Sequence, residues 1–345
     1  MSQIEQMAEQ WQKRVKKGID GNQHKRPYGR TKKIRTIGWN ADGRKIASGS
    51  TDAYVRVYNL ATDSNGESPL ELRGHTGDID QITWHPSQPE LIASTGNDKT
   101  VRLWDTRKSG TAQVIETKAG NINMAWHPDG VILGVGDQND TINFIDIRGG
   151  SGSEGAKIVR KLERDGETNE FSWNYAGNLL YIAKGADLRG SVEILPYPLL
   201  NTAETVEAHT ASCYCIDFDP RGRYWATGSA DSVIGLWDLE ESICVRTFAK
   251  GEFEGPGRTS LTNPIVYSEP IQSLGFSHDG ELLAVGSPDK PVYIIHADSG
   301  QYVGSIDTFG GTTNTVAWHP TKHTLAYAAV KTEGNIHLLS IPSST

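Results

Sequence analysis

Two groups of side chains in this sequence combine a hydroxyl, an imidazole and a carboxylate, the groups that form the nucleophilic triad of serine hydrolases. They occur at equivalent offsets, and each ends on a tryptophan: His75, Ser94, Asp98 and Trp104, then His209, Thr227, Asp231 and Trp237. No G-x-S-x-G nucleophile elbow accompanies either group. A buried indole N–H needs an acceptor, and these side chains could link it to backbone turns. We therefore predict two structural tetrads and no catalytic residue.

Three Trp-His-Pro triplets contain histidines that could suggest a metal site: His85, His127 and His319. Each follows a separate predicted strand, so we expect them to project from different turns and not to converge on one ion. Cys213 and Cys215 lie two positions apart on one predicted strand, a poor geometry for a disulfide, and they indicate a reducing intracellular compartment. The sequence has neither a Walker lysine motif nor a strand followed by G-x-G-x-x-G. We expect no metal, no cofactor and no small-molecule substrate.

The stretch between Trp11 and Arg35 contains ten basic residues and one acid, in a chain whose net charge is −8. Its first part supplies candidate interaction residues: Trp11, Lys13, Arg14, Lys16 and Lys17. The stretch could be a solvated arm, a nuclear-import signal, an RNA contact or a docking segment for an acidic partner. The acidic remainder opposes broad nucleic-acid binding, so we expect any RNA contact to be indirect or weak. No run of 18 or more apolar residues occurs, and we expect no membrane contact.

An aromatic anchor followed by a polar turn recurs along the chain, and it organises these candidates. The anchors are spaced by 42 to 58 residues: Trp39, Trp84, Trp126, Trp173, Phe218, Phe276 and Trp318. About twenty residues after its anchor, each repeat closes on an apolar strand such as Leu103-Trp104-Asp105. A period of roughly 40–45 residues with Trp-Asp punctuation is typical of propellers whose blades are four-stranded sheets. We predict an all-β fold, a seven-bladed WD40 β-propeller over residues 34–345.

The outer strand of each blade follows the Trp-Asp position or its equivalent. Candidates are Leu70–Arg73, Ala112–Thr117, Lys157–Leu162, Thr202–Ala208, Cys244–Ala249 and Tyr302–Ile306. The seventh repeat has no such candidate, so either a weak strand within residues 22–33 completes it or its edge stays open. Three polar segments lengthen the connections: Ala61–Pro69, Gly149–Gly155 and the insertion Gly251–Pro270.

Residues 1–33 are predicted to form a separate helical and basic extension. A helix is expected over residues 3–17, because Ile4, Met7, Trp11 and Val15 recur at helical spacing. Residues 18–33 are expected to be a linker. We expect that residues 1–20 can be removed without unfolding the propeller.

The inner-strand ends could also form a peptide-recognition site, as in a stand-alone adaptor of the chromatin or ubiquitin-ligase type. Four residues before the anchors lie Arg35, Asp80, Ile122, Asn169, Tyr214, Gln272 and Asn314. This set is mixed and contains neither an acidic cluster nor an aromatic cage for a lysine. The composition weakens the reader hypothesis without removing these residues as interaction candidates.

Several segments resemble one family in particular: Gly120-Asn121-Ile122-Asn123, Thr168–Asn174, Val192–Pro198, Ala208–Asp238 with Glu241–Arg246, and Phe276–Gly280. Across residues 34–341 the chain is similar to the THO complex subunit 3 family of WD40-repeat proteins. The resemblance implies a nuclear, non-enzymatic scaffold that binds other THO subunits. It also implies that the THO/TREX assembly recruits an RNA helicase and an export adaptor and couples transcription to mRNA packaging and export. The departures are the Gly149–Gly155 loop and the Gly251–Pro270 insertion, which could alter partner surfaces.

Overall fold

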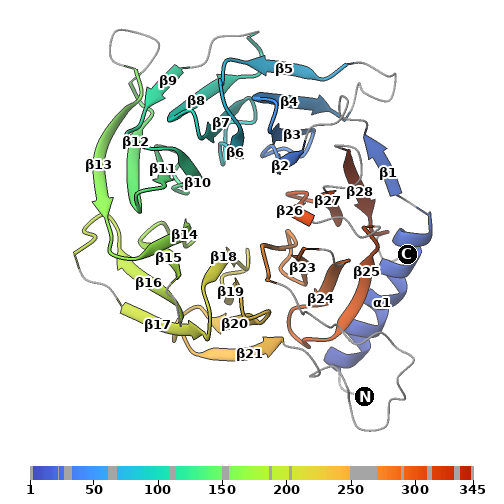
Figure 1. Cartoon of the computed structure of the whole chain (residues 1–345). Helices are drawn as coiled ribbons and strands as arrows, with labels where there is room; N and C mark the ends of the chain where they lie inside the picture. Colours follow the sequence, from blue (N-terminus) through green and yellow to red (C-terminus); the bar gives the residue numbers. More distant parts are fainter. Residues whose placement is uncertain are drawn as a thin grey trace. The chain divides into compact units, whose positions relative to one another are not determined.

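The described residues form one helix and a series of four-stranded sheets, the blades of a seven-bladed β-propeller (Figure 1). The computed structural model describes residues 3–21, 23–26, 33–60, 68–108, 113–149, 155–185, 189–201, 204–248, 270–288, 291–308, 313–329 and 335–342. The predicted fold class is confirmed. Contacts divide the chain into two compact units: residues 31–186 with 192–206, and residues 1–30 with 187–191 and 207–345. Each unit is described separately.

The unit containing residues 31–186 holds the first four blades. Blade one consists of β2 (Ile34–Trp39), β3 (Lys45–Ser50), β4 (Tyr54–Asn59) and β5 (Leu70–Arg73), and blade two of β6 (Ile79–Trp84), β7 (Leu91–Gly96), β8 (Thr100–Asp105) and β9 (Gln113–Glu116). Blade three consists of β10 (Asn121–Trp126), β11 (Ile132–Asp137), β12 (Thr141–Asp146) and β13 (Lys157–Glu163), and blade four of β14 (Glu167–Trp173), β15 (Leu179–Gly185), β16 (Gly190–Pro196) and β17 (Glu204–His209). Second strands such as β7 are buried along almost their whole length. Burial on both faces explains why their sequences are continuous apolar or small-residue runs and do not alternate.

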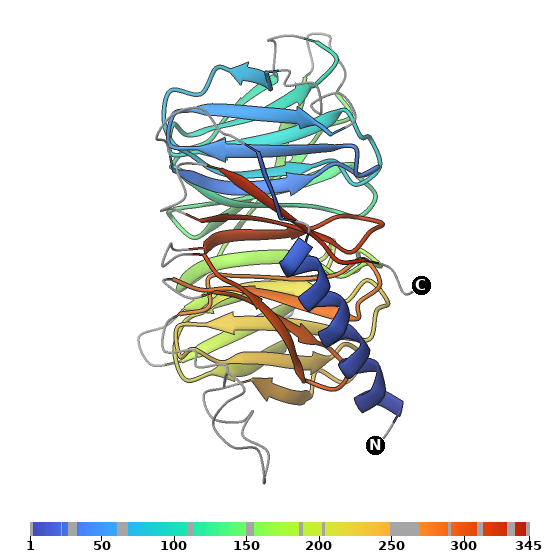
Figure 2. The same cartoon turned by 90° about the vertical axis from the view of Figure 1, so that its right-hand side faces the viewer.

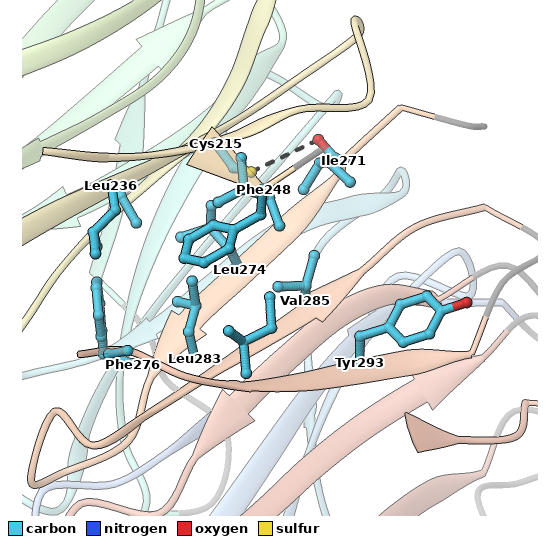
Figure 3. Close-up of a cluster of buried hydrophobic side chains, with 13 residues drawn as sticks. Cys215, Leu236, Phe248, Ile271, Leu274, Phe276, Leu283, Val285 and Tyr293 are labelled. Carbon is cyan, nitrogen blue, oxygen red and sulfur yellow. Dashed lines mark hydrogen bonds between the residues drawn. The ribbon is translucent and has the colours of Figure 1, made fainter. Parts of the chain in front are cut away.

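The other unit holds the last three blades. Blade five consists of β18 (Cys213–Phe218), β19 (Tyr224–Ser229), β20 (Ile234–Asp238) and β21 (Cys244–Phe248), and blade six of β22 (Ser273–Phe276), β23 (Leu282–Gly286), β24 (Val292–His296) and β25 (Tyr302–Ile306). Blade seven consists of β26 (Thr313–Trp318), β27 (Thr324–Ala329), β28 (Ile336–Ser340) and β1 (Gln23–Arg26). Figure 3 shows the core between blades five and six, where Phe248 and Leu236 pack with Leu274 and Leu283. Cys215 belongs to this cluster, and its sulfur lies 3.7 Å from the Ile271 carbonyl oxygen.

Strand β1 completes blade seven, which decides between the two arrangements that the sequence leaves open. It pairs antiparallel with β28, from Gln23 opposite Leu339 to Arg26 opposite Ile336. Its sequence, QHKR, has no β-branched residue. An edge strand can pair through backbone N–H and C=O groups without apolar side chains, so weak strand propensity does not prevent the pairing.

Helix α1 (Gln3–Gly21) is longer than predicted and is part of the core of its unit. It continues four residues beyond Lys17, into the predicted linker, and it lies along β25 and β28 (Figures 1 and 2). Its buried residues are Ala8, Trp11, Val15 and Gly18, whereas Ile4 is 47% exposed. The buried stripe is therefore shifted from the one predicted.

Close packing explains why glycine occupies position 18. A Cβ on Gly18 would lie 2.8 Å from the backbone oxygen of Ser340 on β28. Two side-chain hydrogen bonds fix the helix further: Gln12 Nε2 donates to the Tyr302 carbonyl at 2.8 Å, and Arg14 Nε donates to the Pro342 carbonyl at 2.8 Å. The helix is therefore packed against its unit along its buried face.

Most of the predicted long connections lie outside the described residues: 61–67, 150–154 and 251–269. Among the residues that are described, no helix is long and apolar enough to span a membrane.

Candidate interaction site and supporting networks

The first predicted tetrad is a continuous hydrogen-bond chain inside blade two. Trp104 Nε1 on β8 donates to Ser94 Oγ on β7 at 2.8 Å, and Ser94 Oγ lies 2.7 Å from His75 Nε2. His75 Nδ1 lies 2.8 Å from Asp98 Oδ2, which also accepts from the Thr76 amide at 3.0 Å. The pattern fits a neutral imidazole that donates to Asp98 from Nδ1 and accepts the Ser94 proton at Nε2.

Burial determines what this chain can do. Burial lowers the pKa of His75, which favours the neutral ring. Burial acts to raise the pKa of Asp98, but hydrogen bonds from the Thr76 amide and His75 outweigh it and hold this pKa below its usual value. Ser94 is 0% exposed, so a substrate cannot reach its hydroxyl without opening the blade. The geometry therefore suits a support for Trp104.

Blade five repeats the arrangement with threonine in place of serine. Trp237 Nε1 donates to Thr227 Oγ1 at 3.0 Å, and Thr227 Oγ1 lies 2.8 Å from His209 Nε2. His209 Nδ1 lies 3.2 Å from Asp231 Oδ2. Because the chain tolerates either hydroxyl, its chemistry depends on hydrogen bonding and not on the reactivity of a primary alcohol.

Replacing Ser94 by alanine should destabilise the protein by about 1–3 kcal/mol, because Trp104 and His75 both lose a buried hydrogen-bond partner. Urea unfolding of the variant and the parent measures this difference. Ser94→Thr is the matched control, since it keeps the hydroxyl that blade five uses, and it should be closer to the parent. A hydrolytic activity of the parent that disappears in Ser94→Ala would contradict this assignment.

Two histidines of the Trp-His-Pro triplets connect one blade to the next. His85 Nε2 donates to the Gly130 carbonyl at 2.9 Å, and His127 Nε2 donates to the Gly177 carbonyl at 2.9 Å. Both glycines have positive φ in the turn after an anchor, and a Cβ at either position would overlap the histidine ring. His319 instead accepts from the Thr321 amide of its own turn at 3.1 Å.

The aromatic anchors also lie between neighbouring blades. Trp84 Nε1 donates to the Gly38 carbonyl of blade one at 3.0 Å, and Trp318 Nε1 donates to the Gly275 carbonyl of blade six at 2.9 Å. Each of these anchors therefore fills a slot in its own sheet and ties it to the preceding sheet.

Sequence reasoning missed a set of polar residues that join adjacent inner strands. Thr36 Oγ1 accepts from the Ile82 amide at 3.3 Å, and Ser273 Oγ accepts from the Val316 amide at 3.2 Å. Gln81 accepts from the Met124 amide in the same way. Thr36, Gln81 and Ser273 all lie three residues before an anchor, so a polar residue at that spacing is the signal that could have identified them.

Blade five uses a carboxyl group for this connection. Asp217 Oδ2 accepts from the Phe276 amide of blade six at 2.8 Å. Burial raises the pKa of Asp217 to about 6, against hydrogen bonds that lower it. The folded protein therefore keeps this proton to a higher pH than the unfolded chain does.

This raised pKa predicts a pH-dependent effect of Asp217→Asn. As pH rises from about 4 to about 6, the parent loses stability from this group, because only the folded state must release a proton there. The melting temperature of the variant minus that of the parent should become more positive between pH 4 and pH 7. Asp42→Asn, at an exposed position in a turn, should show no such trend. A constant difference for Asp217→Asn would refute the assignment.

The candidate residues at the inner-strand ends are only partly brought together. In the unit containing residues 31–186, Arg35 pairs with Asp78 at 2.8 Å and with Asp80 at 3.0 Å. Burial raises the pKa of Asp80 to about 6, although Arg35 acts to lower it. Ile122 and Asn169 are half-buried. In the other unit, Tyr214 is half-buried and Gln272 is exposed, while the side chain of Asn314 lies outside what the structure describes.

The candidates on α1 separate into buried and exposed residues. Trp11 is 5% exposed and packs edge-on against His323. The Arg14 guanidinium lies 3.7 Å from the Trp11 ring centroid. Lys13, Lys16 and Lys17 are exposed. The three exposed lysines therefore give this part of the helix a basic surface, and Trp11 is not part of it.

A polar hollow of about 600 Å³ lies on blades three and four. Four basic and four acidic residues are among those that line it: Lys118, Lys161, Arg164, Lys184, Asp137, Glu163, Asp165 and Glu193. Arg164 and Lys184 both contact Glu193, at 2.6 and 3.1 Å. The lining of this hollow is therefore polar, with equal numbers of positive and negative side chains that are partly paired, and it offers little apolar surface to a ligand.

Comparison with known proteins agrees with this architecture. The family model "WD domain, G-beta repeat" matches residues 21–59, 66–105 and 201–238. The β-propeller domain of Cps50 (Swd1) from Myceliophteria thermophila has a TM-score of 0.75 and covers 93% of this chain and 100% of that chain. Its sequence identity is 16%, so this similarity concerns the fold alone.

Two curated relatives are similar in sequence over most of the chain. "WD repeat-containing protein AAC3" of Dictyostelium discoideum is 32% identical over an aligned region that covers 89% of this chain and 64% of that protein. "THO complex subunit 3" of Arabidopsis thaliana is 37% identical over 88% of this chain and 89% of that protein. The chain therefore belongs to the THO complex subunit 3 family of WD40-repeat proteins.

Proposed function

We propose that this protein is a non-enzymatic scaffold subunit of a nuclear THO assembly. The observation that carries the proposal is the similarity to THO complex subunit 3, which extends over 88% of this chain and 89% of the relative. The role of the hydroxyl, imidazole and carboxylate groups supports it, since both sets are hydrogen-bonded to a tryptophan within a blade. In this role the protein binds other THO subunits through its surface, and it acts on no substrate.

The assembly would in turn couple transcription to mRNA packaging and export, as the THO/TREX name implies. The RNA helicase and the export adaptor are then partners of the whole assembly and not of this chain alone. A net charge of −8 disfavours a broad RNA-binding surface on the propeller. The exposed lysines of α1, Lys13, Lys16 and Lys17, are the basic surface that we assign to an acidic partner.

A stand-alone peptide reader has less support. Its site would use the inner-strand ends, and Arg35 there is already paired with Asp78 and Asp80. No aromatic cage is present among the described candidates of that set, Arg35, Asp80, Ile122, Asn169, Tyr214 and Gln272.

Co-purification tests the proposal. The tagged full-length protein, expressed in its own cells, should recover the other THO subunits from nuclear extract, as identified by mass spectrometry. Lys13→Glu/Lys17→Glu should reduce this recovery several-fold without a change in melting temperature. Lys108→Glu/Lys157→Glu, a matched pair of exposed lysines on blades two and three, should not. Recovery of the protein without any THO subunit would refute the proposed function, whereas equal recovery by both variants would refute only the role of α1.

A further inference from the structure

Two hairpin turns bring three potential metal ligands together in the unit that contains α1. His278 and Asp279 belong to the turn between β22 and β23, and His323 belongs to the turn between β26 and β27. One ligand atom from each side chain lies within 4.8 Å of the others. All three residues are half-buried, so the group is neither sealed in the core nor fully solvated.

Hydrogen bonds orient the carboxylate of this group. Asp279 Oδ1 accepts from Ser277 Oγ at 2.7 Å and from the Glu281 amide at 3.2 Å. Its second oxygen, Oδ2, lies 2.7 Å from His323 Nε2. One oxygen is thus used within the turn, and the other faces the neighbouring blade.

The second imidazole has a ring nitrogen with no partner. The rings of His278 and His323 are 4.5 Å apart between centroids. His278 Nδ1 is buried and has no hydrogen-bond partner within the described part of the chain. A buried polar atom without a partner is costly, so its presence beside an ordered carboxylate points to an additional ligand.

We propose that His278, Asp279 and His323 form a binding site for a divalent transition-metal ion of the zinc type. Two imidazoles and one carboxylate are a common set of three protein ligands, with a further position left for water. Imidazole ligands favour zinc, copper, iron and nickel over magnesium and calcium, which prefer oxygen ligands alone.

Binding requires a small rearrangement of the turns. Ligand atoms about 2.0–2.2 Å from a tetrahedral ion lie roughly 3.5 Å apart, closer than the 4.8 Å limit of the present separations. The ion would replace the hydrogen bond between His323 and Asp279, and each imidazole would coordinate in its neutral form.

The site lies next to the middle of α1, where the positive charge of Arg14 opposes binding of a cation. Trp11 packs against His323 at 4.7 Å between ring centroids. Arg14 interacts electrostatically with Asp279, and its guanidinium is fixed over Trp11 and bonded to the Pro342 carbonyl. A nearby positive charge weakens binding of a divalent cation. The ion would therefore join the turns of blades six and seven beneath the helix, with an affinity limited by Arg14.

Titration of the chelator-treated full-length protein with zinc chloride at pH 7.5, against a chromogenic zinc chelator, tests this site. We expect one saturable equivalent, at least tenfold weaker binding in His278→Gln and in His323→Gln, and tighter binding in Arg14→Gln. Cys244→Ser is the control for zinc binding by an exposed thiol elsewhere on the protein. It should leave the zinc affinity unchanged. With cobalt(II), the parent should show the visible bands of a low-symmetry four- or five-coordinate site, and the histidine variants should lose them.

His278→Gln shows whether a loss of zinc binding is separate from a loss of folding. It removes a ring that has an unpartnered nitrogen, so this variant should fold like the parent. Melting temperatures without metal establish this point. Absence of a saturable equivalent in the parent would overturn the proposal. Equal zinc affinity of the parent and both histidine variants would also overturn it, since the ion would then be bound adventitiously elsewhere.

Discussion

Replacement of Trp104 by alanine should lower the free energy of unfolding by about 3–5 kcal/mol. Trp104 is 1% exposed and packs in a cluster with Ile82, Ile92 and other apolar residues of blades one and two. The substitution removes this packing and leaves Ser94 without its indole donor. Urea unfolding followed by far-UV circular dichroism measures the effect.

Trp104→Phe separates the contribution of packing from that of the hydrogen bond to Ser94. The phenyl ring fills much of the slot, but it cannot donate to Ser94, so we expect a loss of about 1–3 kcal/mol. If Trp104→Ala unfolds at the same urea concentration as the parent, the tetrad does not support the blade, and the structural assignment of blade two is wrong.

Replacement of Trp11 by alanine should also cost about 3–5 kcal/mol, because α1 contributes to the core of its unit. Trp11 and Val15 pack with Val303, Leu339 and Ile341 of blades six and seven. Thermal unfolding measures this loss of stability. Lys13→Ala, on the exposed face of the same helix, is the control, and its free energy of unfolding should be within about 0.5 kcal/mol of that of the parent.

Hydrogen exchange locates the effect of Trp11→Ala. Amide protons of β25 and β28, which α1 covers, should exchange faster than in the parent, whereas those of β7 should not. An unchanged melting temperature would contradict this contribution of α1 and would favour the sequence-based expectation that the first twenty residues can be removed without unfolding the propeller.

The blades could be predicted from the sequence because each depends on local signals. The anchor, the polar turn and the Trp-Asp strand all lie within one repeat, and the predicted outer strands Leu70–Arg73 and Tyr302–Ile306 have the observed bounds. The outer strand of blade four, β17, is described from Glu204 to His209, and its predicted start at Thr202 lies outside the described residues.

The features that were missed depend on partners distant in the sequence. Gly18 is a poor helix former, yet it lies within α1 because β28 approaches the helix there. Residues 23–26 look like a linker because their sequence, QHKR, has no β-branched residue, yet they pair with β28. His278 and His323 lie 45 positions apart, and only the packing of blade seven against blade six brings them together. No periodicity within a single repeat carries this information.

Reconstitution tests the central proposal, membership in a THO assembly, most directly. The full-length protein should be co-expressed with the remaining THO subunits, and the mass of the purified assembly should be measured by light scattering during size-exclusion chromatography. We predict that the protein elutes with the other subunits, and that omitting it lowers the mass of the assembly by a multiple of 37.7 kDa. Elution of the folded protein by itself at 37.7 kDa, with an assembly whose mass is the same in its absence, would contradict the proposal.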